Sequence, residues 1–385
     1  MDQSATQAEA LERVTTLELF FDLVFVFTIT QLTSVLVLHP NGRGIAQVAL
    51  MLGVIWWMYD GYAWLTNSVR PDRTERQLGL FAGMAAFLVL ALSVPHAFTG
   101  TGLTFGLAYL AIVLVHTGLF ARSTSATVIQ AIVGLAPFNL VSAAMLLAGG
   151  IAGGTAQYVL WTVAFLFEWV TPRLTEVSDF EVATAHFVER HGLVVIVAIG
   201  ESVVAIGIGA AGLPVNAALV AVAVIGLMLS ACLWWVYFAG EEARAEQALA
   251  AAPPRRRPRM AVDAFGYWHL PILLGIVAVA FALKKSTGHA FDELDLAPAI
   301  GLAGGIATFL VGDVFFRRTL GIDTGPYRAA AAVLTLATIP LGLAASALLQ
   351  IAALVVVFAG ALALERQASS SLYRPMVRSA IESQE

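Results

Sequence analysis

The sequence predicts an all-α membrane protein, a bundle of about twelve spans arranged as two parallel six-helix repeats. The first of three observations behind this prediction is composition. Of 385 residues, 59% are hydrophobic and 12% are charged, and the mean hydropathy is +0.83. Soluble domains carry about 25% charged residues, so much of this surface must face lipid. The other two observations are the apolar runs and the distribution of basic residues.

Apolar runs of membrane-spanning length follow one another along the whole chain. A span needs about 20 mostly apolar residues. Twelve runs approach that length, near 17–38, 46–66, 77–95, 103–121, 128–148, 156–171, 192–210, 215–238, 264–284, 297–316, 328–346 and 348–364.

Lysine and arginine divide unevenly between the loops that these spans define. If the N-terminus, every second loop and the C-terminus share one side, that side holds 18 of the 21 basic residues. The other side holds Arg43, Lys284 and Lys285. Cytoplasmic loops are enriched in lysine and arginine. The division therefore predicts an even number of spans, cytoplasmic termini and a location in the cell inner (plasma) membrane.

Rare residues recur in the same order in both halves of the chain. Trp56-Trp57 precedes His96 and Pro137, as Trp234-Trp235 precedes His289 and Pro340. A six-span unit returns to its starting side, so two copies would run parallel. The predicted segments are a cytoplasmic N-terminal segment (1–16), a first repeat (17–171), a cytoplasmic linker (172–191), a second repeat (192–364) with a basic cytoplasmic loop (239–263), and a cytoplasmic tail (365–385).

Composition also excludes several functional classes. The formal net charge of -5 argues against a nucleic-acid partner. The single cysteine, Cys232, excludes an intramolecular disulfide or a cysteine metal cluster. Phosphate-binding loops, zinc-protease motifs and serine-hydrolase motifs are missing from the sequence. We therefore expect no catalytic residues, no cofactor and no metal. The expected partners are membrane lipids and a small solute or ion, and the sequence leaves room for an oligomer.

Ionisable side chains inside the spans are the candidate functional residues, because each costs about 2.5–3.5 kcal/mol to insert. Glu201 lies nine residues past Gly192, about 13 Å along a helix, which predicts a midplane carboxylate without a basic residue in its own span. A carboxylate desolvated there would hold a proton, and the alternative is a hydrogen-bonded structural glutamic acid. The proton or ion site candidates are Glu201, Asp22, Glu18, Asp60, Glu168, Asp313 and His116.

Three of these acids stand beside residues that suggest a ligand. Glu18 and Asp22 share a helix face behind Arg13, as in a cation site at an entrance or in a neutralised interfacial cluster. Asp60 lies four residues from Trp56 and from Trp64. Aromatic rings around an acid suit an organic cation, although interfacial tryptophans and a paired aspartate would give the same pattern.

The segment before the seventh span and a stripe on the first span complete the candidates. In this segment His186 and Glu189 lie three residues apart, a spacing at which both could bind a metal ion. No second pair of ligands accompanies them, so a titratable or salt-bridged helix start is favoured over a metal site. Phe25, Ile29 and Leu32 form either packing or a gate that works by dewetting. The candidate residues of the cytoplasmic entrance are Arg13, His186, Glu189, Arg190 and His191.

Several runs resemble the bacterial low temperature requirement A family. They are 14–27 (VTTLELFFDLVFVF), 186–193 (HFVERHGL), 198–202 (AIGES) and 267–271 (YWHLP). The resemblance covers most of the chain and implies a membrane address and a helical architecture. Arg13 with 20–25 (FFDLVF) is also similar to the first pore helix of potassium channels that carry an Arg…Phe-Ser-Asp motif, although Phe21 stands where those channels have serine.

Together these patterns predict a low temperature requirement A-like membrane protein that moves a small solute or ion, with protons as the coupling ion. One alternative is a cation channel with the first span lining the pore. Another is a non-transporting protein, either a lipid-modifying enzyme or an accessory protein in cold adaptation.

The distribution of basic residues predicts the topology. A reporter fused after Arg378 and one inserted at 253–259 should both report cytoplasm, and one inserted near Asn41 should report the outside. A reporter near Asn41 on the same side as the tail would rule out the twelve-span topology.

Overall fold

The computed structural model describes residues 13–123, 125–175, 180–323 and 325–382, with side chains described up to residue 368. All regular structure in these residues is helical, which confirms the predicted all-α class. The helices are α2 (Thr16–Leu38), α3 (Gly42–Ser68), α4 (Thr74–Ser93), η1 (Val94–His96), α5 (Gly102–Phe120), α6 (Ala126–Ala152), α7 (Gly154–Leu174), α8 (Thr184–Ala210), α9 (Ala217–Phe238), α10 (Glu241–Ala251), α11 (Arg257–Ala261), η2 (Val262–Tyr267), α12 (His269–Ser286), α13 (Leu296–Leu320), α14 (Pro326–Leu336), α15 (Ile339–Ala344) and α16 (Ala347–Glu382).

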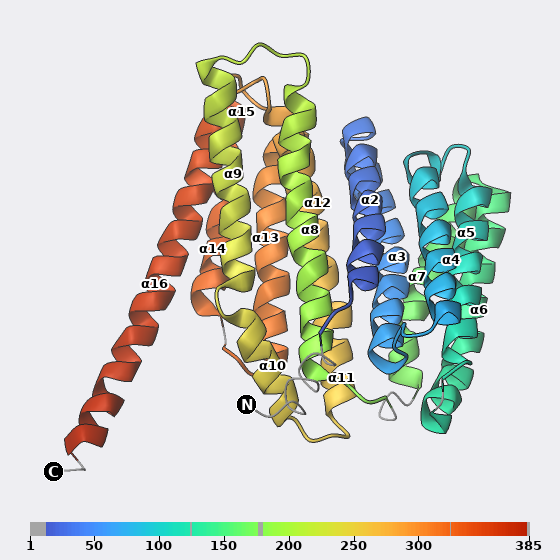
Figure 1. Ribbon diagram of the computed structural model, residues 1–385. Coiled ribbons are helices and arrows are strands. Elements are labelled where there is room, and N and C mark those ends of the chain that lie inside the picture. The colour runs from blue at the N-terminus through green and yellow to red at the C-terminus, as the bar shows by residue number, and fades with distance from the viewer. Residues whose placement is uncertain (1–12, 124, 176–179, 324, 383–385) are drawn as a thin grey trace.

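Eleven segments of the described chain are long and apolar enough to cross a membrane. Helix α7 has 21 residues but carries Gln157 and Glu168, and its composition keeps it outside that group. It nevertheless packs against α6 and α3 at the position of the sixth predicted span. The beginning of α2 and the end of α16 lie at the same end of the bundle (Figure 1).

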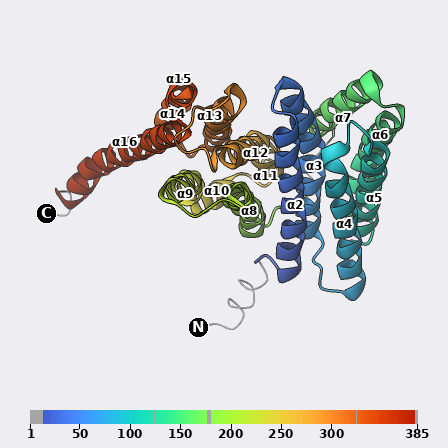
Figure 2. The same ribbon diagram turned by 90° about the horizontal axis from the view of Figure 1, so that it is seen from above.

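The helices form two groups that meet along α2 and α3. In the first half, α2 contacts α3 and α4, and α4, α5, α6 and α7 follow side by side. In the second half, α8 contacts α9 and α12, and α12, α13, α14 and α16 follow in the same way. Helices α2 and α3 of the first half face α8 and α12 of the second (Figure 2).

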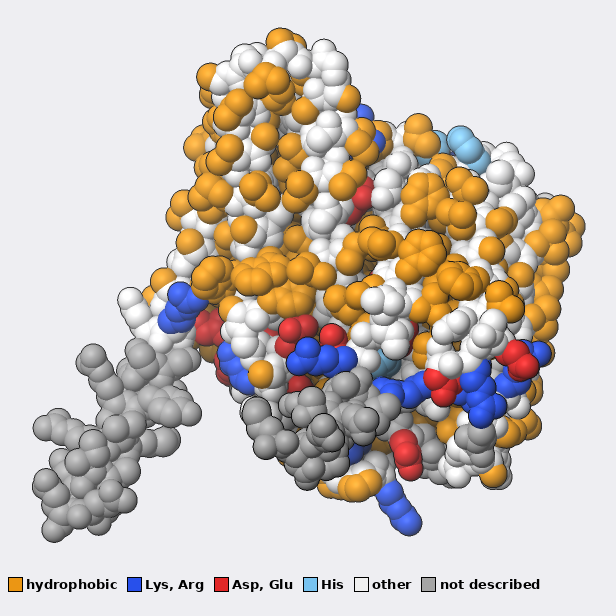
Figure 3. Space-filling view, viewed as in Figure 1, with side chains coloured by type: hydrophobic (Ala, Val, Ile, Leu, Met, Phe, Trp, Pro, Cys, Tyr) orange, Lys and Arg blue, Asp and Glu red, His pale blue; other side chains and the backbone are white. Residues whose placement is uncertain are grey.

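The outer surface of the bundle is apolar over much of its height. Leucine and valine side chains such as Leu23, Val133 and Val356 are 58%, 65% and 70% exposed. Charged side chains gather toward one end of the visible face (Figure 3). An apolar belt with a charged rim is the distribution expected of a surface in contact with lipid.

Two boundaries differ from the predicted segments. Helix α8 begins at Thr184, ahead of the apolar run at 192–210, so residues 186–191 form the start of this helix. Helix α16 continues beyond 364 to Glu382. Both extensions are polar in sequence. The apolar run therefore ends before the helix does, and hydropathy alone places the boundary too early or too late.

The stripe of Phe25, Ile29 and Leu32 on α2 is fully buried, at 0% exposure for each residue. Phe25 contacts Trp56 and Tyr59 of α3 through its ring. In this conformation the stripe is therefore helix packing.

Replacing Ile29 with asparagine should lower the yield of folded protein, because an unpaired buried amide costs about 1–3 kcal/mol. Ile29→Val, which costs about 0.5–1.5 kcal/mol, is the matched control. Yield and monodispersity by size-exclusion chromatography measure the effect. A well-folded Ile29→Asn protein that raises ion leak in liposomes would instead support the gate.

Candidate functional site at the interface of the two halves

A chain of buried polar side chains crosses from the first half to the second. It consists of Glu18 and Asp22 on α2, Tyr59 and Asp60 on α3, and His186, Arg190 and His191 on α8, and we call it the interface network. Each of these residues is at most 6% exposed. Buried ionisable groups persist only where partners compensate their charge, so the contacts within this network decide whether the two halves fit together.

The start of α2 fixes the first acid of the network. Thr15 and Glu18 form a capping box, in which the Thr15 hydroxyl accepts from the Glu18 backbone N–H and Glu18 Oε2 accepts from the Thr15 backbone N–H at 2.8 Å. This arrangement leaves Glu18 Oε1 free to contact His186 Nε2 at 2.9 Å. The same carboxylate thus caps its own helix and joins α2 to α8.

One turn deeper, Arg190 and Asp22 form the second contact. Arg190 donates to Asp22 Oδ2 at 2.8 Å and to the Glu18 carbonyl at 2.7 Å. Both side chains are 1% exposed. The Tyr59 hydroxyl of α3 donates to the other Asp22 oxygen. Both acid–base pairs span 168 residues, because α2 and α8 begin at the same end of the bundle and present residues four apart on facing sides (Figure 1).

The contact between His191 and Asp60 requires a proton. His191 Nδ1 lies 2.8 Å from the Phe187 carbonyl, which only accepts, so Nδ1 carries hydrogen. His191 Nε2 lies 2.9 Å from Asp60 Oδ1. Two lone pairs do not form a hydrogen bond, so a further proton lies between these atoms. The pair therefore holds one proton more than a neutral imidazole and a carboxylate, whichever of the two residues carries it.

A cavity of about 70 Å³ lies next to Asp60 within the first half. Asp60 and Gly61 line it together with Trp57 and Trp64. The predicted partner Trp56 faces elsewhere: at about 100° per residue it lies about 40° to one side of Asp60, whereas Trp57 and Trp64 lie about 60° and about 40° to the other side. Its indole N–H donates to the Gly266 carbonyl in the π-helical turn η2 at 2.7 Å. The remaining lining residues are Met58 of α3 and, from α5, α6 and the segments after them, His116, Phe120, Ile132, Leu135, Asn139, Pro172, Phe180 and Val262.

A second, polar cavity of about 650 Å³ lies at the end of the bundle where α8 begins. Asn67, Glu181, Arg255 and Arg257 are among its lining residues. Phe180 lines both cavities. The small cavity beside Asp60 and this polar cavity, which we call the vestibule, therefore share the Phe180 side chain at the basic end of the molecule.

Glu201 forms a separate contact between the halves. It accepts a hydrogen bond from the Thr30 hydroxyl of α2 at 2.6 Å and is 3% exposed. Helix α8 runs from Thr184 to Ala210, so Glu201 lies a little past its middle. Lys284 at the end of α12 is near enough to act on its charge. The basic neighbour of this carboxylate thus comes from another helix, and the depth of Glu201 in the membrane stays a prediction.

Three other predicted candidates lie apart from the interface network. Tyr109 donates to Glu168 within the first half. His116 Nε2 donates to the Gly61 carbonyl at 3.0 Å, and its buried Nδ1 has no hydrogen-bond partner in the described residues. Asp313 accepts from Arg328 at 2.7 Å in the second half. His116 and Asp313 therefore lie in different halves and do not contact one another.

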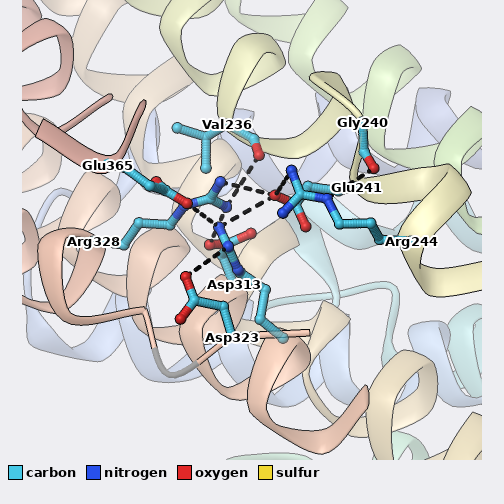
Figure 4. A network of polar contacts seen from close by, with 9 residues as sticks. Val236, Gly240, Glu241, Arg244, Asp313, Asp323, Arg328 and Glu365 are labelled. Atoms are coloured by element: carbon cyan, nitrogen blue, oxygen red, sulfur yellow. Dashed lines mark hydrogen bonds and ion pairs between the residues drawn. The ribbon is translucent and has the colours of Figure 1, made fainter. Parts of the chain in front are cut away.

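Asp313 belongs to a second ion network inside the second half (Figure 4). Arg328 contacts Asp313, Glu241 and Glu365 at 2.7–3.0 Å. Arg317 contacts Glu241, Glu365 and Asp323 at 2.7–3.2 Å. These contacts join α10, α13, α14 and α16 within one half, and this network therefore stabilises that half rather than the interface.

The remaining entrance candidates lie at the rim of the interface network. Glu189 Oε2 accepts from the Val14 backbone N–H at 3.2 Å, and Arg13 is exposed just before α2. Within the described residues no group of three or more histidine, cysteine, aspartate or glutamate side chains could hold a metal ion.

Sequence reasoning missed Tyr59, Arg317, Arg328 and Glu241. The two arginines were counted with the topology signals, and Tyr59 was hidden in an aromatic run. His269, which follows η2 and contacts the Tyr237 hydroxyl at 2.7 Å, was seen only as part of a family-like run.

Comparison with known proteins gives a family match without an assigned activity. The sequence model described as "Bacterial low temperature requirement A protein (LtrA)" matches residues 13–363. "Uncharacterized protein RA0937" of Rhizobium meliloti (strain 1021) is 28% identical over 321 residues, which cover 78% of this chain and 76% of that protein. No solved structure matches the chain.

Removing Arg190 should destabilise the protein more than removing an exposed arginine. Arg190→Met leaves Asp22 buried without its partner, which costs about 3–5 kcal/mol. Arg173→Met, whose side chain is 54% exposed beside Asp263, should cost less than about 1 kcal/mol. Thermal unfolding in detergent measures both. Adding Asp22→Asn to Arg190→Met should recover part of the loss, and no recovery would argue against a coupled pair.

Proposed function

The chain belongs to the bacterial low temperature requirement A family, and we propose that this integral membrane protein carries a small solute or ion by rocking its two halves, coupled to protons. The observation that carries the proposal is the position of the interface network. All three of its acid–base contacts, Glu18–His186, Asp22–Arg190 and Asp60–His191, join α2 or α3 to α8.

The two ends of the interface differ. At the end where α2 and α8 begin, buried charge pairs hold the halves together. At the opposite end, a largely apolar groove of about 530 Å³ lies between the α2–α3 connection and α12 and α13. An interface that ion pairs close at one end and that opens into a groove at the other end is expected of a carrier in one of its two alternating conformations.

The proton of the His191–Asp60 pair provides the coupling. If α8 moves away from α3, the pair separates, and its proton must stay with one partner or leave to water. Glu201 is the other acid at the interface, but the Thr30 hydroxyl already satisfies it in either protonation state and it requires no extra proton. We therefore assign coupling to His191 and Asp60 rather than to Glu201.

We propose further that the halves are parallel repeats and that the basic end is cytoplasmic, in the inner membrane. The order of helix contacts supports the repeat: α2 with α3 and α4 corresponds to α8 with α9 and α12, and α3 with α7 corresponds to α9 with α16. The uneven division of basic residues supports the orientation.

Proton movement in liposomes tests the function. Reconstituted protein should move protons, read by an internal pH dye, when a gradient of sodium, potassium or tetramethylammonium is imposed. His191→Gln should abolish this movement, whereas Glu201→Gln, which still accepts from Thr30, should retain most of it. Folded protein that moves no protons with any of the three cations would refute the carrier. Loss in Glu201→Gln but not in His191→Gln would transfer the coupling to Glu201.

A further inference from the structure

The cavity beside Asp60 combines features that a cation requires. Trp57 and Trp64 of α3 line it one turn either side of Asp60, and Phe120 and Phe180 line it from other segments. Aromatic faces attract cations by about 2 kcal/mol or more when the site is desolvated. Asp60 supplies the negative charge, and the other polar lining groups are His116 and Asn139.

The lining of the cavity favours an alkylated cation over a metal ion. Most of the lining is carbon, and the described residues contain no cluster of oxygen and nitrogen ligands that could hold a metal. A metal ion needs several oxygen ligands in place of its water shell. A small ammonium ion that carries methyl groups needs only one carboxylate and aromatic faces.

The occupant and the proton would compete for Asp60. His191 Nε2 contacts Asp60 Oδ1 from the second half, and the cavity lies next to Asp60 in the first half. The neighbouring titratable groups are His116 on α5, Asp22 on α2, and Arg190 on α8, with His269 on α12 in ring contact with His191. None of these supplies a second carboxylate to the cavity, so Asp60 must serve both the proton and the cation.

We infer that this cavity binds a small methylated ammonium ion, which takes the place of the proton shared by His191 and Asp60. The exchange balances: one cation enters, one proton leaves to water, and the buried charge stays constant. His191 then has a neutral Nε2 with no attraction to Asp60, and the contact between α3 and α8 loosens. The exchange step rests on the proposed function, whereas the binding itself does not.

The polar vestibule lies next to the site on the side of the basic end, because Phe180 lines both cavities. Its wall holds one acidic side chain, Glu181, together with Arg255 and Arg257.

Binding of tetramethylammonium to the purified full-length protein in nanodiscs tests the site. Tryptophan fluorescence should report saturable binding that tightens as pH rises, with release of up to one proton per cation in weakly buffered solution. Trp57→Leu should weaken binding by about tenfold or more. The control is Trp234→Leu on α9, where Trp234 is 40% exposed, and this change should leave binding unchanged. Trp57 is only partly buried, so its replacement should preserve the fold.

Further variants and ligands distinguish the cation site from its alternatives. Asp60→Asn should abolish binding and proton release, with folding checked by size-exclusion chromatography. Potassium, or uncharged tert-butanol, binding as well as tetramethylammonium would overturn the inference, as would tetramethylammonium binding that ignores both pH and Trp57→Leu. Binding without transport in liposomes would refute the proposed carrier but keep the site. Transport without binding would refute the site but keep the carrier.

Discussion

The buried pair of Arg190 and Asp22 is the constraint on which the interface depends. Both side chains are nearly inaccessible, and neither has a solvent route to compensation in the closed arrangement. A buried guanidinium without its carboxylate is strongly unfavourable, so α2 and α8 must keep the register that brings them together. That register also sets Glu18 opposite His186. The contact of His191 with Asp60 adds α3 to this arrangement, because Asp60 belongs to α3 and not to α2.

The two ion networks differ in where they lie relative to the boundary between the halves. The network around Arg328 joins helices of a single half and includes two arginines and four carboxylates. The interface network, in contrast, has every acid–base contact on the boundary. The rocking motion proposed above would break the contacts of the interface network and leave the network around Arg328 intact. Its cost would therefore be concentrated in a few titratable groups.

Much of the fold was predictable because hydropathy in a membrane protein reports directly on helices. The candidate acids Glu18, Asp22 and Asp60 and the basic residues His186, Arg190 and His191 were each singled out from sequence, and they lie in one network. The pairing was not predictable, because it depends on the parallel contact of α2 and α8, which are far apart in sequence. The contact of Glu201 with Thr30 was not predictable either, because it joins α8 to α2. Arg317 and Arg328 were missed because a buried arginine and a topology signal look alike in sequence.

The proton between His191 and Asp60 follows from hydrogen-bond directions rather than from any property of either residue alone. The Phe187 carbonyl fixes the donor at Nδ1, so the contact between Nε2 and Asp60 needs one further proton, held by either partner. His186 is different: its Nδ1 has no partner in the described residues, so a neutral ring with hydrogen on Nε2 satisfies Glu18 without an extra proton. Two histidines five residues apart on one helix therefore play unequal parts. His186 can hold the halves together in a single protonation state, whereas the contact of His191 exists only while its proton is present, and this makes the state of the interface depend on proton supply.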